Sequence, residues 1–291
     1  MIDISFLNSL SRLKLAMKYK SSMSMSGNRK SIQKGNSTEF SGFREYAHGD
    51  DPRRIDWNAF ARLNKLYIKE YMEEKESTVR ILIDTSSSMN YGSNSKSLLA
   101  VKLSLAIAYI AINNLDRVIL YDLNHIESPY KCTSGKNSIP GLVNWLDNLH
   151  FDGTKKLTDI IYSLAPIGNG ITILISDLLN EDIIDTPEVF EKMIKYFIYQ
   201  KHNINILHVL SQEELNVNFE GTLNLIDMED NSKIKVSMEN KSIKNYEKLL
   251  TDFINSVQNI TVKNQGQYSL CDTGLSFEQI IFEKLRFMYD I

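Results

Sequence analysis

VRILIDTSSSM, residues 79–89, is the segment from which the architecture of this chain can be inferred. Its first five residues are rich in β-branched side chains and predict a short buried strand, and Asp84 falls where that strand ends. Ser86 and Ser88 follow at alternate positions. Asp84-x-Ser86-x-Ser88 therefore offers three hard oxygen ligands on one tight loop, which suits Mg²⁺. A serine-rich cap for the next helix is the alternative interpretation.

Helix and strand patterns alternate after this loop. Residues 96–113 are apolar on most sides and predict a buried helix, whereas 117–123 and 171–175 predict strands with continuous apolar runs. This alternation predicts an α/β fold with a doubly wound, mostly parallel sheet and helices on both faces. The other predicted elements are helices over 138–149, 187–199 and 241–257, a strand over 205–210, a hairpin within 219–238, and a strand followed by an amphipathic helix within 267–291.

Two acidic residues mark a candidate site. In open α/β sheets, ligands bind beyond the carboxyl ends of the strands. Asp84 and Asp177 each follow a predicted strand, so we expect their carboxylates to converge on one ion. A further hydroxyl ligand is expected from the loop and helix that precede Asp177. Thr158, at the start of that predicted helix, and Thr154, four residues earlier, are the two candidates.

The composition limits the class of protein. With 291 residues, 43% hydrophobic residues, 24% charged residues and a formal net charge of −3, the chain resembles an ordinary globular protein and gives no reason to expect a nucleic-acid partner. Cys132 and Cys271 form no CxxC motif and fit a reducing compartment. Residues 1–20 predict an amphipathic docking helix rather than a signal peptide, and 98–112 is too short for a membrane span. We therefore expect a cytoplasmic protein without a membrane span.

Residues 1–77 are predicted to form an accessory segment before the α/β domain, which covers 78–291. Within it, 39–70 places acids and arginines around turn-forming residues, and 66–71 predicts a strand. Arginine forks pair with carboxylates, so this block predicts a structural ion-pair network anchored by Trp57 and Phe60; a partner surface is the alternative. The residues of the block are Arg44, Asp50, Asp51, Arg53, Arg54, Asp56, Trp57 and Arg62.

This block resembles the bacterial family labelled domain of unknown function 58. The likeness is carried by three motifs: Arg44-x-Tyr46, Gly49-Asp50-Asp51-x-Arg53-x-Ile55-Asp56-Trp57 and Ala61-Arg62. The later Asp-x-Ser-x-Ser loop resembles the metal-ion-dependent adhesion site of von Willebrand factor A domains. The resemblance implies a von Willebrand factor A-like domain with a metal site formed by Asp84, Ser86, Ser88, Thr158 and Asp177.

The resemblance also implies a function. In von Willebrand factor A sites, one coordination position of the ion, Mg²⁺ or alternatively Mn²⁺ or Ca²⁺, is left open for an acidic residue of a protein partner. Members of the domain of unknown function 58 family are often paired with MoxR-type AAA+ ATPases and are thought to act as adaptors in chaperone-like assembly or maturation. The sequence contains no GxxxxGK[ST] motif, so ATP hydrolysis would have to come from such a partner.

An enzyme is the main alternative. Asp84 at a strand end could serve a Mg²⁺-dependent phosphohydrolase as nucleophile or ligand. Haloacid-dehalogenase-type phosphatases need a second aspartate two positions later, where this chain has Ser86. The sequence also lacks the G-x-S-x-G and HExxH motifs. We therefore expect a non-catalytic binding module, with a purely structural metal loop as a third possibility.

Overall fold

The computed structural model describes residues 40–71, 78–113, 116–132, 138–154, 157–164, 170–217, 221–226, 233–238 and 240–288. The chain divides into two compact units, a larger one that includes Ser77–Ile291 and a smaller one, Lys20–Glu76. The predicted division between residues 77 and 78 falls next to this boundary. The predicted N-terminal helix and the loop that follows it lie outside the described residues.

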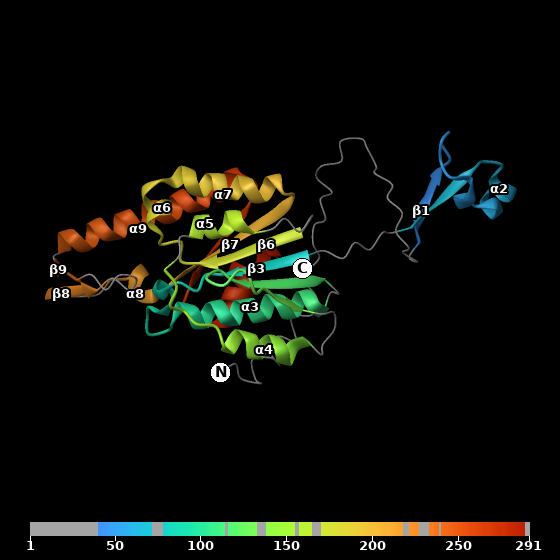
Figure 1. Cartoon of the computed structure of the whole chain (residues 1–291). Helices are drawn as coiled ribbons and strands as arrows, with labels where there is room; N and C mark the ends of the chain where they lie inside the picture. Colours follow the sequence, from blue (N-terminus) through green and yellow to red (C-terminus); the bar gives the residue numbers. More distant parts are fainter. Residues whose placement is uncertain are drawn as a thin grey trace. The chain divides into compact units, whose positions relative to one another are not determined.

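A six-stranded sheet forms the centre of the larger unit, in the order β10-β7-β6-β3-β4-β5 (Figure 1). Strand β5 pairs antiparallel with β4, and the other neighbouring strands of the sheet are parallel. Strand β3 lies between β6 and β4 and is buried over its whole length, because both faces of the sheet are covered. The strands are β3 (Thr78–Ile83), β4 (Arg117–Asp122), β5 (Tyr130–Cys132), β6 (Gly170–Ser176), β7 (His202–Leu210) and β10 (Gln267–Asp272).

Alternate residues of β3 enter two different cores. Ile81 and Ile83 pack on one face with α3 (Lys96–Asn113), α4 (Ile139–Asp147) and the C-terminal segment. Leu82 packs on the opposite face. The helices on that second face are α5 (Leu157–Ser163), α6 (Glu181–Asp185), α7 (Pro187–Tyr199) and α9 (Asn240–Lys263). The predicted doubly wound α/β architecture is confirmed.

Helix α3 is the central helix of the first core. Among the described residues it is the helix whose length and apolar composition would allow it to cross a membrane, and 72% of it is buried inside the structure. The core helix of a globular domain meets the same criteria. The prediction that this segment packs between the sheet and its neighbours is confirmed.

The chain between β7 and the C-terminus departs from the prediction in two places. A short helix, α8 (Gln212–Leu215), follows β7 and precedes the predicted hairpin, whose strands are β8 (Gly221–Ile226) and β9 (Lys233–Met238). The predicted hairpin turn lies outside the described residues. The last amphipathic helix is instead divided into α10 (Phe277–Gln279), a π-helical turn (Ile280–Lys284) and a 3-10 turn (Arg286–Met288). The wider turn buries Ile280 and Ile281 side by side.

In its described residues, 40–71, the smaller unit contains a two-stranded antiparallel sheet and one short α-helix. Strands β1 (Phe40–Glu45) and β2 (Tyr67–Tyr71) pair, which confirms the strand predicted over 66–71 in a small accessory sheet. A 3-10 turn (Pro52–Arg54) and α2 (Trp57–Leu63) connect them. The predicted apolar anchor is not found within the described residues of this unit: the side chains of Trp57 and Phe60 contact each other but are 62% and 37% exposed.

Candidate metal centre

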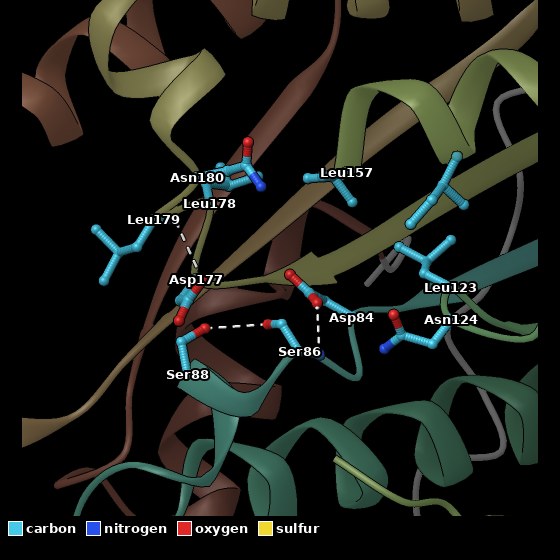
Figure 2. A pocket seen from close by; sticks show the side chains of 11 residues that line it. Asp84, Ser86, Ser88, Leu123, Asn124, Leu157, Asp177, Leu178, Leu179 and Asn180 are labelled. Atoms are coloured by element: carbon cyan, nitrogen blue, oxygen red, sulfur yellow. Dashed lines mark hydrogen bonds between the residues drawn. The ribbon is translucent and has the colours of Figure 1, made fainter. Parts of the chain in front are cut away.

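The loops after β3 and β6 lie side by side at the carboxyl edge of the sheet. The two strands pair in parallel, and the backbone N–H of Asp84 donates to the carbonyl of Ile175 over 2.9 Å. This pairing places Asp84 and Asp177 in one pocket, where they are 9% and 2% exposed (Figure 2). The other lining residues are aliphatic except for Ser86, Ser88, Asn124 and Asn180.

Asp84 is held by two hydrogen bonds. Its Oδ1 accepts from the backbone N–H of Ser86 over 2.9 Å, and its Oδ2 accepts from the hydroxyl of Ser176. Burial and the neighbouring charge of Asp177 raise the pKa of the Asp84 carboxyl above its usual value. Two buried carboxylates in one pocket repel each other, so a cation between them would stabilise the ionised pair.

Ser86 and Ser88 fit a small divalent ion. Their Oγ atoms lie 3.0 Å apart, within hydrogen-bond distance of each other. Adjacent ligands of an octahedral Mg²⁺, with bonds of about 2.1 Å, are separated by about 3 Å. Ser88 belongs to a 3-10 turn (Ser87–Asn90), which holds the two hydroxyls close together. Hydroxyl and carboxylate oxygens are also the ligand types that Mg²⁺ prefers.

The donor set depends on these hydroxyls. In the part of the chain that the structure describes, no group of three His, Cys, Asp or Glu side chains is placed to hold a metal ion. The pocket therefore differs from the acid-rich or histidine-rich sites that such groups form.

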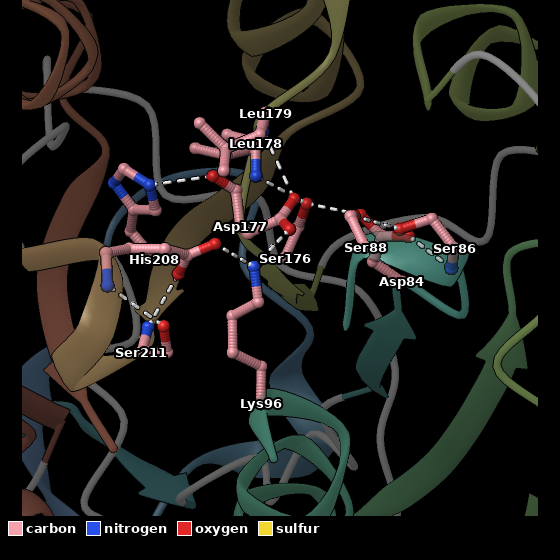
Figure 3. A network of polar contacts seen from close by, with 11 residues as sticks. Asp84, Ser86, Ser88, Lys96, Ser176, Asp177, Leu178, Leu179, His208 and Ser211 are labelled. Atoms are coloured by element: carbon pink, nitrogen blue, oxygen red, sulfur yellow. Dashed lines mark hydrogen bonds and ion pairs between the residues drawn. The ribbon is translucent and has the colours of Figure 1, made fainter. Parts of the chain in front are cut away.

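Asp177 has partners for both carboxylate oxygens. Oδ1 accepts from the backbone N–H of Leu179 over 3.1 Å, and Oδ2 lies 2.8 Å from Nζ of Lys96. Figure 3 shows the contact of Lys96 with Asp177. The same Nζ lies 2.6 Å from Oε1 of Glu214, so one buried ammonium joins two carboxylates. Burial alone would lower the pKa of Lys96, but Asp177 and Glu214 together raise it above its usual value. Lys96 is therefore a fixed positive charge beside the pocket.

The structure does not place Thr158 among the residues that line the pocket. Thr158 is buried in α5, where its hydroxyl donates to Oδ2 of Asp182 over 3.3 Å, while Leu157 and Ile160 of the same helix face the pocket. Thr154 does not line the pocket either, but it directly follows Gly153, whose backbone pairs with that of Ser86.

Gly153 is required by this close approach of two loops. Its N–H donates to the carbonyl of Thr85 over 3.1 Å, and its carbonyl accepts from the N–H of Ser87 over 3.0 Å. A Cβ atom at this position would lie 1.7 Å from Nδ2 of Asn124. Asn124 in turn donates to the hydroxyl of Thr85 over 2.6 Å. The segment before α5 is thereby fixed against the loop of Asp84.

Sequence reasoning missed three side chains around this pocket: Asn124, Lys96 and Glu214. Asn124 follows β4, a third strand that ends at the same edge, so the rule that found Asp84 and Asp177 could have found it. Lys96 looks in the sequence like an ordinary solvent-exposed residue at a helix start. Its partners are 81 and 118 residues away, and no local signal connects them.

The block of acids and arginines in the smaller unit is a structural network only in part. Arg44 pairs bidentately with Asp50 through two contacts of 2.6 Å, and this hydrogen bonding lowers the pKa of Asp50 to about 2. Asp51 and Asp56 accept from backbone N–H groups at the starts of the 3-10 turn and α2, and Asp56 also pairs with Lys69 over 3.3 Å. The remaining arginines of the block, Arg53, Arg54 and Arg62, are exposed.

Comparisons place the sequence in a wider context. The model of a family described as "Protein of unknown function DUF58" matches residues 42–252. No curated protein matches the sequence.

Three solved structures are similar to the chain at low identity. An aerotolerance-related membrane protein from Bacteroides fragilis, with multiple mutations to serines, is 17% identical, covers 72% of this chain and 98% of its own, and has a TM-score of 0.42. The conserved hypothetical protein BatB from Bacteroides thetaiotaomicron is 15% identical, with coverages of 73% and 98% and a TM-score of 0.37. A von Willebrand factor type A protein from Catenulispora acidiphila is 15% identical, with coverages of 68% and 43% and a TM-score of 0.35.

Proposed function

The chain belongs to the family described as protein of unknown function DUF58, and from the geometry of its pocket we propose that it is a metal-dependent protein-binding module. The observation that carries this proposal is the convergence of Asp84, Ser86, Ser88 and Asp177 in one pocket at the carboxyl edge of the sheet. Neighbouring parallel strands bring these oxygens together, although 93 residues of sequence separate the two aspartates.

Mg²⁺ is the proposed ion, with Mn²⁺ or Ca²⁺ as alternatives. Ser86 and Ser88 would ligate through their hydroxyls, and Asp84 and Asp177 directly or through water. Mg²⁺ usually keeps several of its waters in protein sites, so one of them can exchange for a carboxylate of a partner protein. The bound ion would thus act as a bridge between two proteins.

We propose a binding role rather than catalysis. Ser86 stands where haloacid-dehalogenase-type phosphatases have their second aspartate, and both oxygens of Asp84 already accept hydrogen bonds within the site. Such an arrangement favours a fixed ligand over an attacking nucleophile. For the partner we propose a MoxR-type AAA+ ATPase, with this chain as an adaptor in chaperone-like assembly or maturation, because the family resemblance implies that pairing.

The first test is direct binding of Mg²⁺ to the purified full chain, measured by calorimetry. Wild type is expected to bind one ion, and Asp84→Ala is expected to lose binding. Asp147→Ala, which removes an exposed aspartate of α4, is the matched control and should bind as wild type does. Equal binding by wild type and Asp84→Ala would exclude this pocket as the metal site.

The second test addresses the partner. Capture from a lysate of the source cell is compared for wild type in Mg²⁺, wild type in EDTA and Asp84→Ala in Mg²⁺, after the folding of the variant has been checked. An AAA+ ATPase retained by wild type in Mg²⁺, and by neither of the other two samples, would support the adaptor function. Retention that is unaffected by both chelator and mutation would exclude metal-dependent docking.

A further inference from the structure

Lys96 begins α3 and its side chain is completely buried, with 0% exposure. Its ammonium contacts Asp177 and Glu214, whose side chains are 3% and 12% exposed. A buried ammonium is costly unless carboxylates surround it, so these two contacts are what keep Lys96 inside the protein. Lys96 thus joins the loop after β6 to α8 (Figure 3).

The charges around Lys96 are unbalanced. Asp84, Asp177 and Glu214 supply three carboxylates and Lys96 supplies one ammonium, which leaves two formal negative charges when all four groups are ionised. One divalent cation would balance them. The lysine and a divalent ion would therefore share the same group of acids and repel each other across it.

Asp177 stands between the two cation positions. Its Oδ2 lies on Lys96 and its Oδ1 accepts from the backbone of Leu179, so neither oxygen is free to turn toward the serine hydroxyls without breaking a contact. An ion held by Ser86 and Ser88 would therefore share Asp177 with Lys96, because each oxygen of this carboxylate already has one partner.

Glu214, the second partner of Lys96, belongs to the capping box at the N-terminus of α8. Glu214 accepts from the N–H of Ser211 over 2.7 Å and donates its own N–H to the Ser211 hydroxyl, forming a capping box. The adjacent Glu213 instead accepts from the backbone N–H of Ser93 over 3.1 Å. Within the described residues, α8 is therefore connected to the pocket through the contact of Glu214 with Lys96, whereas Glu213 contacts Ser93.

We propose that Lys96 is a positioning residue that competes with the divalent ion for Asp177 and couples occupancy of the metal site to the position of α8. The inference rests on the proposed metal function. The bound ion attracts the carboxylate of Asp177 and so weakens the ion pair between Asp177 and Lys96. The ion pair between Lys96 and Glu214 changes as a consequence. The site consequently binds its ion more weakly than the same oxygens would without the lysine.

The test compares Mg²⁺ affinity and amide hydrogen exchange in full-length variants. Lys96→Met removes the charge and keeps an unbranched side chain that is one atom shorter. It should lower the Kd for Mg²⁺ by about tenfold or more, because a repulsive charge is lost and Asp177 is released. Glu214→Gln should raise the Kd several-fold, since the ammonium then depends on Asp177 alone. Glu213→Gln makes the same charge change one residue away and should leave the Kd within about twofold of wild type.

Hydrogen exchange supplies a readout that does not depend on affinity. Addition of Mg²⁺ should change exchange at residues 212–215 in wild type, and this response should disappear in Lys96→Met. A purely structural lysine would instead give lower stability, with an unchanged or weaker Kd in the folded protein.

The outcomes separate this inference from the proposed function. Tight binding by wild type with an equal or weaker affinity in Lys96→Met would overturn the role of Lys96 and leave the metal site standing. If Lys96→Met does not fold, Glu214→Gln decides, and an unchanged Kd in that variant overturns the inference. Binding by Lys96→Met but not by wild type would support it, and binding by neither would overturn both proposals.

Discussion

Nε2 of His208 lies 2.8 Å from the backbone carbonyl oxygen of Asp177, a residue that lines the candidate metal pocket. A carbonyl can only accept, so Nε2 carries the hydrogen, and Nδ1 accepts from the hydroxyl of Tyr268 over 2.8 Å. The ring is completely buried and packs edge-on against Phe253. The neutral imidazole thus fixes the backbone that presents Asp177, and burial lowers the pKa of His208 to about 4.

His208 should make the fold sensitive to acid. The pKa of His208 is 6.5 in the unfolded chain and about 4 in the folded protein. Between these two pH values, the unfolded chain binds a proton at this histidine that the folded chain does not bind. Stability should therefore fall as the pH drops through this window, by up to about 3 kcal/mol. Urea unfolding at pH 7 and pH 4.5 measures the effect. His208→Gln keeps a hydrogen-bond donor for the Asp177 carbonyl but does not titrate in this range, so its free energy of unfolding should fall less between pH 7 and pH 4.5. An equal fall in wild type and His208→Gln would contradict the role of His208 in acid sensitivity.

Removal of the hydroxyl of Ser86 or of Ser88, in the loop after β3, should weaken metal binding. Ser86→Ala and Ser88→Ala should each raise the Kd for Mg²⁺ by about tenfold, because each removes one oxygen ligand. Ser87→Ala is the control from the same loop. The hydroxyl of Ser87 lies 3.4 Å from the Gly153 carbonyl, and Ser87 is not among the residues that line the pocket. Calorimetry of the three variants decides. Weakening by Ser87→Ala equal to that by its neighbours would assign the effect to the loop conformation instead.

The two candidate threonines should respond differently to replacement by valine. Thr154→Val should raise the Kd for Mg²⁺, because Thr154 adjoins the glycine that pairs with Ser86. Thr158→Val should leave the Kd unchanged but lower the free energy of unfolding by about 1 kcal/mol, through loss of its hydrogen bond to Asp182. Calorimetry and chemical unfolding measure the two quantities. The reverse pattern would make Thr158 the ligand.

Gly153→Ala should disturb the pocket through a single neighbour. The new methyl group would collide with Asn124, so we expect a loss of about 1–3 kcal/mol of stability and weaker Mg²⁺ binding. Asn124→Ala removes the obstacle, and the double variant should be no less stable than Asn124→Ala alone. Thermal unfolding of the single and double variants tests this non-additivity. If the losses of stability in the two single variants simply add up in the double variant, the new methyl group does not act through Asn124.

The sheet and the two aspartates could be predicted from the sequence because both depend on local patterns. Continuous apolar runs mark buried parallel strands, and Asp84 and Asp177 are the first acids after two of them. The order of the strands in the sheet was not predicted from the sequence. Asn124 follows an equivalent strand end, so the same rule could have identified it, although asparagine is also common in turns.

The rest of the pocket depends on contacts that the sequence does not encode locally. The segment from Gly153 to Thr158 has no apolar period, so spacing could not show which threonine follows the residue that pairs with Ser86. Lys96 acquires its role from acids on distant elements. The exposure of Trp57 likewise depends on how other segments pack around it, which its own sequence does not encode.

The sheet ends on one side in β5, a strand of three residues that runs antiparallel to β4. So short an edge exposes few unpaired backbone groups, and a foreign strand added there would gain few hydrogen bonds. That side of the molecule is thus protected from edge-to-edge aggregation. In the proposed binding module, recognition would fall to the loops at the carboxyl ends of the strands, where side chains rather than backbone groups would select the partner.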